Sequence, residues 1–199
     1  MTALWSDDAP EAADASLNAL VSRVRAVLAR IPESPAELRS ASGAYTLLLP
    51  PDVLVDRERA WRAINHVLAI RRQGDVRGAW AEAVIANEIA ARGFLPGDQA
   101  QWIEAERRTL RDIELQALEA IGDAEIDERR PGEAERVARR VIATDALRES
   151  GYRLLMRALA AGGNAAQAAR VMDECRAALA GARALPSAET ERVFREVLR

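Results

Sequence analysis

The sequence has little of what most catalytic and metal sites require. Cys175 is the only cysteine and His66 the only histidine, so these residue types can supply neither an internal disulfide nor a zinc tetrad. All 28 basic residues are arginine, and a phosphate-binding Walker loop needs a lysine. The acidic pairs lie in runs mixed with arginine, which is typical of solvated surface. We therefore expect no catalytic residue, no metal and no cofactor.

Long apolar runs and an excess of positive charge are also missing. No stretch approaches the length of a membrane span, and the first residues carry Asp7 and Asp8 instead of the basic segment of a secretion signal. The net charge is -3 and the isoelectric point is near 5.4, so the chain as a whole has no basic field for nucleic acid. We expect a cytoplasmic protein without membrane contact, in which any contact with DNA is local.

What the chain does contain is a repeat with a period of 34 residues. A set of small and apolar residues near the C-terminus recurs 34 positions later, and an earlier copy precedes that second set by 89 positions, which is two periods and a 21-residue insert. The three sets are Ala63, His66, Val67, Ala79, Ala83 and Ala86; Leu118, Ile121, Gly122, Ala134, Ala138 and Val141; and Tyr152, Leu155, Met156, Ala168, Met172 and Cys175.

A period of 34 residues is that of the tetratricopeptide (TPR) helix pair. Such pairs bury their apolar faces only by stacking on one another, and the resulting scaffolds usually bind other macromolecules. Chance similarity among alanine-rich helices is the competing explanation. The repeat predicts a mainly helical, TPR-like fold in which the repeated positions, His66 and Cys175 among them, face the core.

The part before the repeats has a different pattern. Apolar residues at steps of three and four predict an amphipathic helix over residues 11–31, which Pro32 and Pro35 would end. Two short strands, over residues 37–40 and 44–49, are expected to flank a turn at Ala41, Ser42 and Gly43. Pro50 and Pro51 then mark a boundary between a domain of residues 1–51 and a domain of residues 52–199.

The second part, from Asp56 to Leu198, is predicted to be helical throughout. Its helices are separated by breakers at Gly74, Gly93 to Gly97, Pro131 with Gly132, Gly162 with Gly163, and Pro186. Asp98 is expected to cap a long helix, and Pro186 with Ser187 to open the last one. Trp61, Trp80 and Trp102 lie in helical apolar patterns, which favours packing in the core over a platform for stacking nucleic-acid bases.

A helix followed at once by a small hairpin is the second half of a winged helix, and here the chain resembles a known family. The matching residues are Leu4 to Pro10, Val21 to Arg25, Gly43 to Tyr45, Asp56 and Trp61, then Phe94 to Gly97, Trp102, Glu104, Arg107, Asp145, Arg148, Glu149, Leu155 to Leu159, and Leu185 to Ser187. They resemble the SARP/AfsR family of bacterial transcriptional activators, in which an OmpR-type DNA-binding domain precedes a bacterial transcriptional activation domain (BTAD).

The resemblance implies a transcription regulator that contacts the transcription machinery and a second protomer through its helical repeats. The family's DNA-binding domain begins with a four-stranded sheet and two helices, which would precede Leu4 and have no residues in this sequence. We therefore expect a partial winged helix, one helix and a hairpin, in which Val21, Val24 and Leu28 lose packing partners. Ala146 also departs from the proline that the family usually has after Asp145.

Position and resemblance together select candidate DNA-binding residues on the helix over residues 11–31. Arginine and asparagine read base edges, and serine and arginine also bind phosphate. The candidates opposite the apolar stripe are Asn18, Ser22, Arg23 and Arg25.

The alternative for the same face is a plain solvated surface, since residues 1–50 hold four arginines against six acidic residues. Two functions stay open. The first is a SARP-type regulator that binds double-stranded DNA and contacts RNA polymerase or another protein, with possible homo-oligomerisation. The second is a stand-alone TPR-like protein-interaction module that does not bind DNA.

Overall fold

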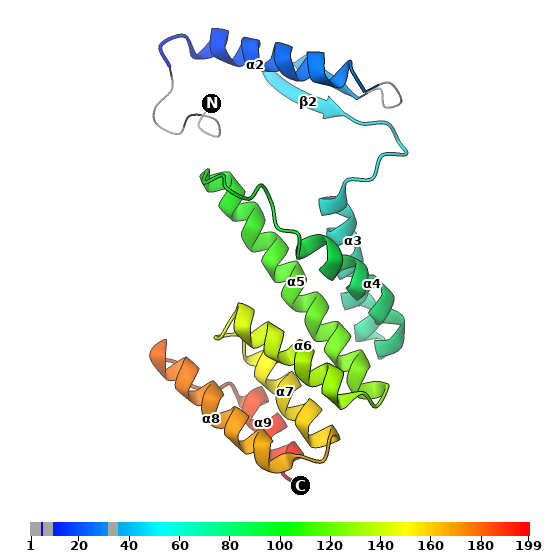
Figure 1. Cartoon of the computed structure of the whole chain (residues 1–199), viewed down its shortest axis with the longest axis vertical. Coiled ribbons are helices and arrows are strands. Elements are labelled where there is room, and N and C mark those ends of the chain that lie inside the picture. The colour runs from blue at the N-terminus through cyan, green and yellow to red at the C-terminus, as the bar shows by residue number, and fades with distance from the viewer. Residues whose placement is uncertain (1–4, 6–9, 32–35) are drawn as a thin grey trace. The chain divides into compact units, whose positions relative to one another are not determined.

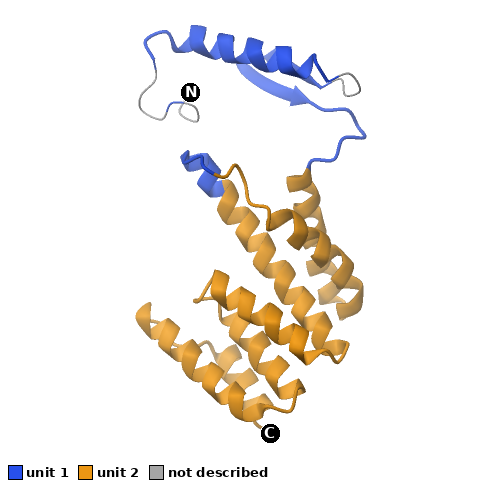
Figure 2. Ribbon diagram, viewed as in Figure 1, with its two compact units in different colours: residues 1–55, 97–105 blue, residues 56–96, 106–199 orange. Residues whose placement is uncertain are grey.

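A computed structural model describes Trp5 and residues 10–31 and 36–199, and it is mainly helical, as the sequence predicts (Figure 1). The described chain forms two compact units, residues 1–55 with 97–105 and residues 56–96 with 106–199 (Figure 2). Pro32 and Pro35, expected to end the first helix, and the family-like residues Leu4 and Ser6 to Ala9 lie outside the described residues.

The described residues between 10 and 55 form one helix and a hairpin. Helix α2 (Ala13–Leu28) is shorter at both ends than predicted. Strands β1 (Glu37–Ala41) and β2 (Ala44–Leu48) pair antiparallel, with Ala41 opposite Ala44. The turn therefore has two residues instead of three. Ser42 and Gly43 have φ of 50° and 76°, the left-handed conformation that a tight hairpin turn of this kind requires.

Helix α2 buries little of its apolar stripe. Val21 is buried and Leu28 is half-buried, whereas Val24 is exposed together with Leu20, Val27 and Ile31. Val24 is thus exposed as expected, whereas the expectation is wrong for Val21, which is buried.

The second unit is a stack of helix pairs. The pairs are α3 (Asp56–Arg72) with α4 (Val76–Ala90), α5 (Gln101–Asp127) with α6 (Pro131–Thr144), and α7 (Glu149–Ala161) with α8 (Ala165–Gly181), followed by α9 (Ala188–Val197). No helix in the described part of the chain is both long and apolar enough to cross a bilayer.

Burial confirms the repeat. In all three copies the repeated positions are buried, with two exceptions: Ile121 is half-buried, and His66 has 59% of its side chain exposed. The expectation that His66 is packed in the core is wrong. Leu155, its equivalent in the third copy, is fully buried, whereas His66 lies at the surface with its Nδ1 4.0 Å from Glu82 on α4.

Helix α5 joins two hydrophobic cores. Its residues Leu110, Ile113 and Ala117 pack with α3 and α4 in a core built largely from alanine. Leu115 and Leu118 belong to the second core, made with the helices that follow, and Ile121 packs against both. The 21-residue insert predicted from the repeat is the loop over residues 91–100 together with the N-terminal extension of α5.

Side chains cap several helices where the sequence has cap residues. Asp75 and Asn164 open α4 and α8, and Ser187 opens α9 as expected. The prediction for Asp98 is wrong, because the Ala100 carbonyl accepts the first hydrogen bonds of α5, from Ile103 and Glu104.

The break between α6 and α7 contains neither glycine nor proline and was not predicted. The Asp145 carboxylate accepts a hydrogen bond from the Leu147 amide at 3.0 Å, and Asp145 itself is extended. This local turn ends the helix without a classical breaker residue.

The expectation that the tryptophans pack in the core is also wrong. Trp61 is 58% exposed, and Trp80 and Trp102 are exposed as well. On α3 the buried positions are Ala60, Ala63, Ile64 and Val67, and Trp61 lies on the flank of that stripe. An aromatic inside a helical pattern can therefore still point away from the stripe that packs.

Cys175 is fully buried, as predicted, and burial raises the pKa of its thiol to about 11. At pH 8 only about one thiol in a thousand would then be ionised. We expect no reaction with Ellman's reagent in the native protein and one equivalent of thiol in guanidinium chloride. Rapid labelling of the native protein would contradict this packing.

Candidate functional site

The four candidate DNA-binding residues all lie on α2, and two of them are hydrogen-bonded to the hairpin. The Arg25 guanidinium donates from Nε and Nη2 to the Leu38 carbonyl, at 3.1 and 3.0 Å. The Tyr45 hydroxyl donates to Asn18 Oδ1 at 3.1 Å. Asn18 and Arg25 thus connect α2 to both strands, and Ser22 donates within the helix to the Asn18 carbonyl at 2.9 Å.

Arg23 lies on a different side of α2. At 100° per residue it falls on one face with the small residues Ala19 and Ala26, all three of which are exposed, and Arg30 is exposed in the turn that follows the helix. This face lies between the edge that binds the hairpin and the exposed apolar edge. Small residues beside the Arg23 guanidinium allow close approach to a partner.

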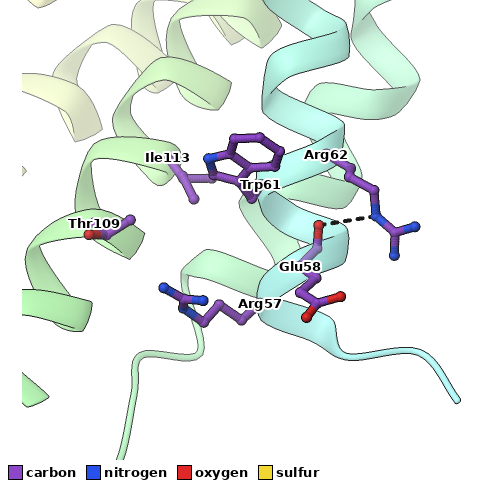
Figure 3. Close-up of a pocket in the computed structure, with 6 residues that line it drawn as sticks. All are labelled: Arg57, Glu58, Trp61, Arg62, Thr109 and Ile113. Atoms are coloured by element: carbon purple, nitrogen blue, oxygen red, sulfur yellow. Dashed lines mark hydrogen bonds between the residues drawn. The ribbon is translucent and has the colours of Figure 1, made fainter. Parts of the chain in front are cut away.

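The second unit contains a groove between α3 and α5, with a volume of about 450 Å³ (Figure 3). Its lining residues are Arg57, Glu58, Trp61 and Arg62 from α3 and Thr109 and Ile113 from α5. Ile113 is buried and forms an apolar floor beside the exposed Trp61 ring. Among the described residues, the Arg62 guanidinium bonds only to the Glu58 carbonyl, at 3.3 Å.

Ion pairs connect α3 and α5 beside the groove and again further toward the C-terminal ends of the two helices. Arg57 binds Glu106 through two hydrogen bonds, at 2.5 and 2.9 Å. Further along the helices, Arg71 on α3 pairs with Asp123 on α5. Because the paired residues follow the same order along both helices, α3 and α5 run in the same direction.

Asp123 carries two guanidinium partners. Its side chain is 11% exposed and pairs with Arg71 and with Arg157 on α7. A smaller pocket of about 160 Å³ opens there, and its charged lining residues are Arg71, Arg153, Arg157, Glu119, Asp123 and Glu189. The three positive and three negative side chains that line the pocket balance, and Arg71 and Arg157 are partly exposed.

The groove and its arginines were not among the residues predicted from the sequence. One signal was present, because Trp61 falls beside the apolar stripe of α3 and not within it. No sequence pattern predicts the contacts between α3 and α5, because they join residues about 50 positions apart across the insert.

Comparisons with known proteins agree with this architecture. The profile of the bacterial transcriptional activator domain matches residues 55–198. The regulatory protein AfsR of Streptomyces coelicolor is 30% identical over 178 residues, which are 89% of this chain and 17% of AfsR.

A solved structure, Mycobacterium tuberculosis EmbR in complex with a low-affinity phosphopeptide, is similar over the whole chain. The TM-score is 0.88 at 22% identity, and the match covers 100% of this chain and 53% of the EmbR chain. The chain therefore spans about half of EmbR and a sixth of AfsR. The fold, the repeats and the profile match together show that the chain belongs to the bacterial transcriptional activator domain family of SARP/AfsR-type regulators.

Proposed function

We propose that this chain is a transcription regulator that contacts double-stranded DNA through α2 and protein partners, RNA polymerase among them, through the helical repeats. The observation that carries the DNA contact is the exposed face of α2 on which Arg23 lies beside Ala19 and Ala26, with Arg30 exposed just after the helix. A helix with such a face fits the major groove, where arginine contacts guanine edges and phosphates.

In this proposal the four candidate residues have two roles. Arg23 and Ser22 contact DNA. Asn18 and Arg25, which hydrogen-bond to the hairpin, act as positioning residues that hold the wing against the helix. Residues 1–50 carry a net charge of -2, so the affinity for DNA rests on a few local contacts.

The repeats support the protein-binding part of the proposal. They bury their cores in a continuous stack and leave a mixed apolar and charged groove at the surface. Stacked repeats of this kind present extended surfaces to partners. Homo-oligomerisation through the repeats belongs to the same proposal, and the molecular mass of the particle in solution measures it.

The DNA contact is tested by selection of duplexes from a random pool, followed by fluorescence anisotropy with the enriched sequence. Arg23→Ala is expected to weaken binding about tenfold, the effect of losing one arginine contact. Arg139→Ala is the matched control, since Arg139 lies on α6 in a surface pair with Glu135. Equal affinity of the Arg23→Ala variant and the wild type would overturn the assignment of this face.

Variants of Arg25 are expected to give a result that differs from that of Arg23→Ala. Arg25→Ala is expected to lower the affinity through loss of the hairpin contact, so the circular dichroism of the variant changes along with the binding. Arg25→Lys can still donate to the Leu38 carbonyl and should restore part of both signals. Loss of binding in both variants with unchanged spectra would instead assign Arg25 to direct DNA contact.

A further inference from the structure

The hairpin has a free edge along β2. Ala41 and Ala44 flank a two-residue turn and exchange both of their backbone hydrogen bonds, so every second residue along each strand points its N–H and C=O away from the other strand. On β2 the outward-pointing residues are Tyr45 and Leu47. Within the described part of the chain, their outward N–H and C=O groups make no hydrogen bond.

The outer edge of β1 differs from that of β2. Arg25 donates to the Leu38 carbonyl, which is one of the outward-pointing groups of β1. The strand also carries Glu37 and Arg39, and charged side chains are a common protection of edge strands against pairing with another chain. The sequence over residues 41–51 contains no charged residue, and β2 itself contains no proline. The edge of β2 therefore lacks both kinds of protection.

From these features we infer that β2 pairs with β2 of a second copy of this chain, antiparallel and about a two-fold axis at Thr46. In this register Tyr45 of each copy lies opposite Leu47 of the other. Each of these two pairs exchanges two backbone hydrogen bonds, so the outward groups of both residues are all used. The result is a continuous sheet of four strands. The inference goes beyond the proposed function, in which self-association belongs to the repeats.

The composition of β2 selects a second copy as the occupant of this edge. An uncharged strand has no charge pattern that would favour a strand of different sequence. The two-fold axis instead places Thr46 opposite Thr46 and the Tyr45 ring against an apolar leucine side chain, and cross-strand contacts of these kinds stabilise sheets. Tyr45 and Leu47 are 37% and 48% exposed in the single chain, so both have apolar surface left to bury.

The outer edges of the four-stranded sheet explain why the assembly stops at two copies. Both outer strands would be β1, whose edge carries the Arg25 contact and charged side chains. Pairing through identical surfaces about a two-fold axis is closed, whereas pairing between different surfaces continues into rings or fibres. A dimer is therefore expected.

A cysteine at the proposed axis tests the register. Residues opposite each other in a pair without hydrogen bonds have Cα atoms about 4.5 Å apart, within the range of a disulfide. Thr46→Cys should therefore form a linked dimer under mild oxidation of the full chain. Arg39→Cys is the matched control, since Arg39 is also exposed and lies opposite Thr46 on β1, but its two copies would be about 14 Å apart. Cys175 is fully buried and does not interfere.

Proline substitutions test the free edge itself. Leu47→Pro removes an outward-pointing N–H, so the hairpin keeps its own hydrogen bonds while the dimer loses two of its four. Sedimentation equilibrium of the full chain, from low micromolar to millimolar concentration, should show a reversible dimer for the wild type and an association at least about tenfold weaker for Leu47→Pro. Ser40→Pro removes an outward N–H of β1 and should dimerise as the wild type does.

Three results would overturn the inference. The first is a wild-type chain that stays monomeric over the whole concentration range, and the second is equal rates of cross-linking for Thr46→Cys and Arg39→Cys. The third is a Leu47→Pro variant that dimerises as strongly as the wild type, which would place self-association elsewhere, as on the repeats. If Leu47→Pro alters the circular dichroism of the chain, the cysteine comparison still decides.

The result is distinct from that of the DNA experiment, because neither measurement of the dimer contains DNA. If the chain retains its selected duplex but stays monomeric, the pairing of β2 fails and the DNA contact stands. If the chain dimerises as described but retains no duplex, the DNA contact fails and the pairing stands.

Discussion

Leu155→Ala is expected to lower the free energy of unfolding by about 2–5 kcal/mol, the cost of removing a fully buried leucine side chain and leaving a cavity. Leu155 is 0% exposed in the second core, among α7 and its neighbours. Urea denaturation followed by circular dichroism at the helix band measures the change.

The repeat supplies a matched control for this substitution. His66 occupies the same repeat position as Leu155 but is exposed, so His66→Ala should change the unfolding free energy by no more than about 0.5 kcal/mol. Similar losses for both variants would contradict the burial pattern of the first helix pair.

Gly122→Ala is expected to cost about 2 kcal/mol, although alanine is the better helix former. A Cβ at position 122 would lie no farther than 3.2 Å from Cγ and both Cδ atoms of Leu154, which is itself buried on α7. The whole Leu154 side chain would have to move within a packed core, or α5 would have to shift away from α7. Overpacking of this kind costs about 1–3 kcal/mol.

Gly132→Ala provides the opposite case. Gly132 lies in α6, and a Cβ there meets no atom within 4 Å. The gain in helix propensity, up to about 1 kcal/mol, should then leave this variant as stable as the wild type or more stable. If the Gly122→Ala variant unfolded at the same temperature as the wild type, this would contradict the close approach of α5 and α7.

The helical repeats could be predicted from the sequence because their period depends on contacts that each pair repeats with its neighbour. The same period led to the wrong prediction that His66 is buried, because a repeat pattern treats equivalent positions alike even where their surroundings differ. Trp61 was misplaced for a related reason. Its spacing is helical, but the angle between it and the alanine stripe of α3 decides its exposure.

The candidate interfaces were less predictable because they depend on how separate elements fold onto each other. A helical wheel of α2 identifies a polar face but cannot show which part of that face the hairpin covers. The hydrogen bonds of Asn18 and Arg25 depend on the path of the chain after Ile31. The groove beside Trp61 needs the extension of α5, whose packing against α3 has no short-range sequence signal.

The central claim, that α2 gives this chain a DNA contact of its own, is tested most directly by the salt dependence of binding to the selected duplex. The logarithm of the association constant is predicted to fall linearly with the logarithm of salt concentration. A control duplex with the same bases in scrambled order is predicted to bind more weakly. Arg23→Ala should reduce the slope by about one if Arg23 contacts a phosphate. Absence of binding at low salt, or equal affinity for both duplexes, would contradict the claim.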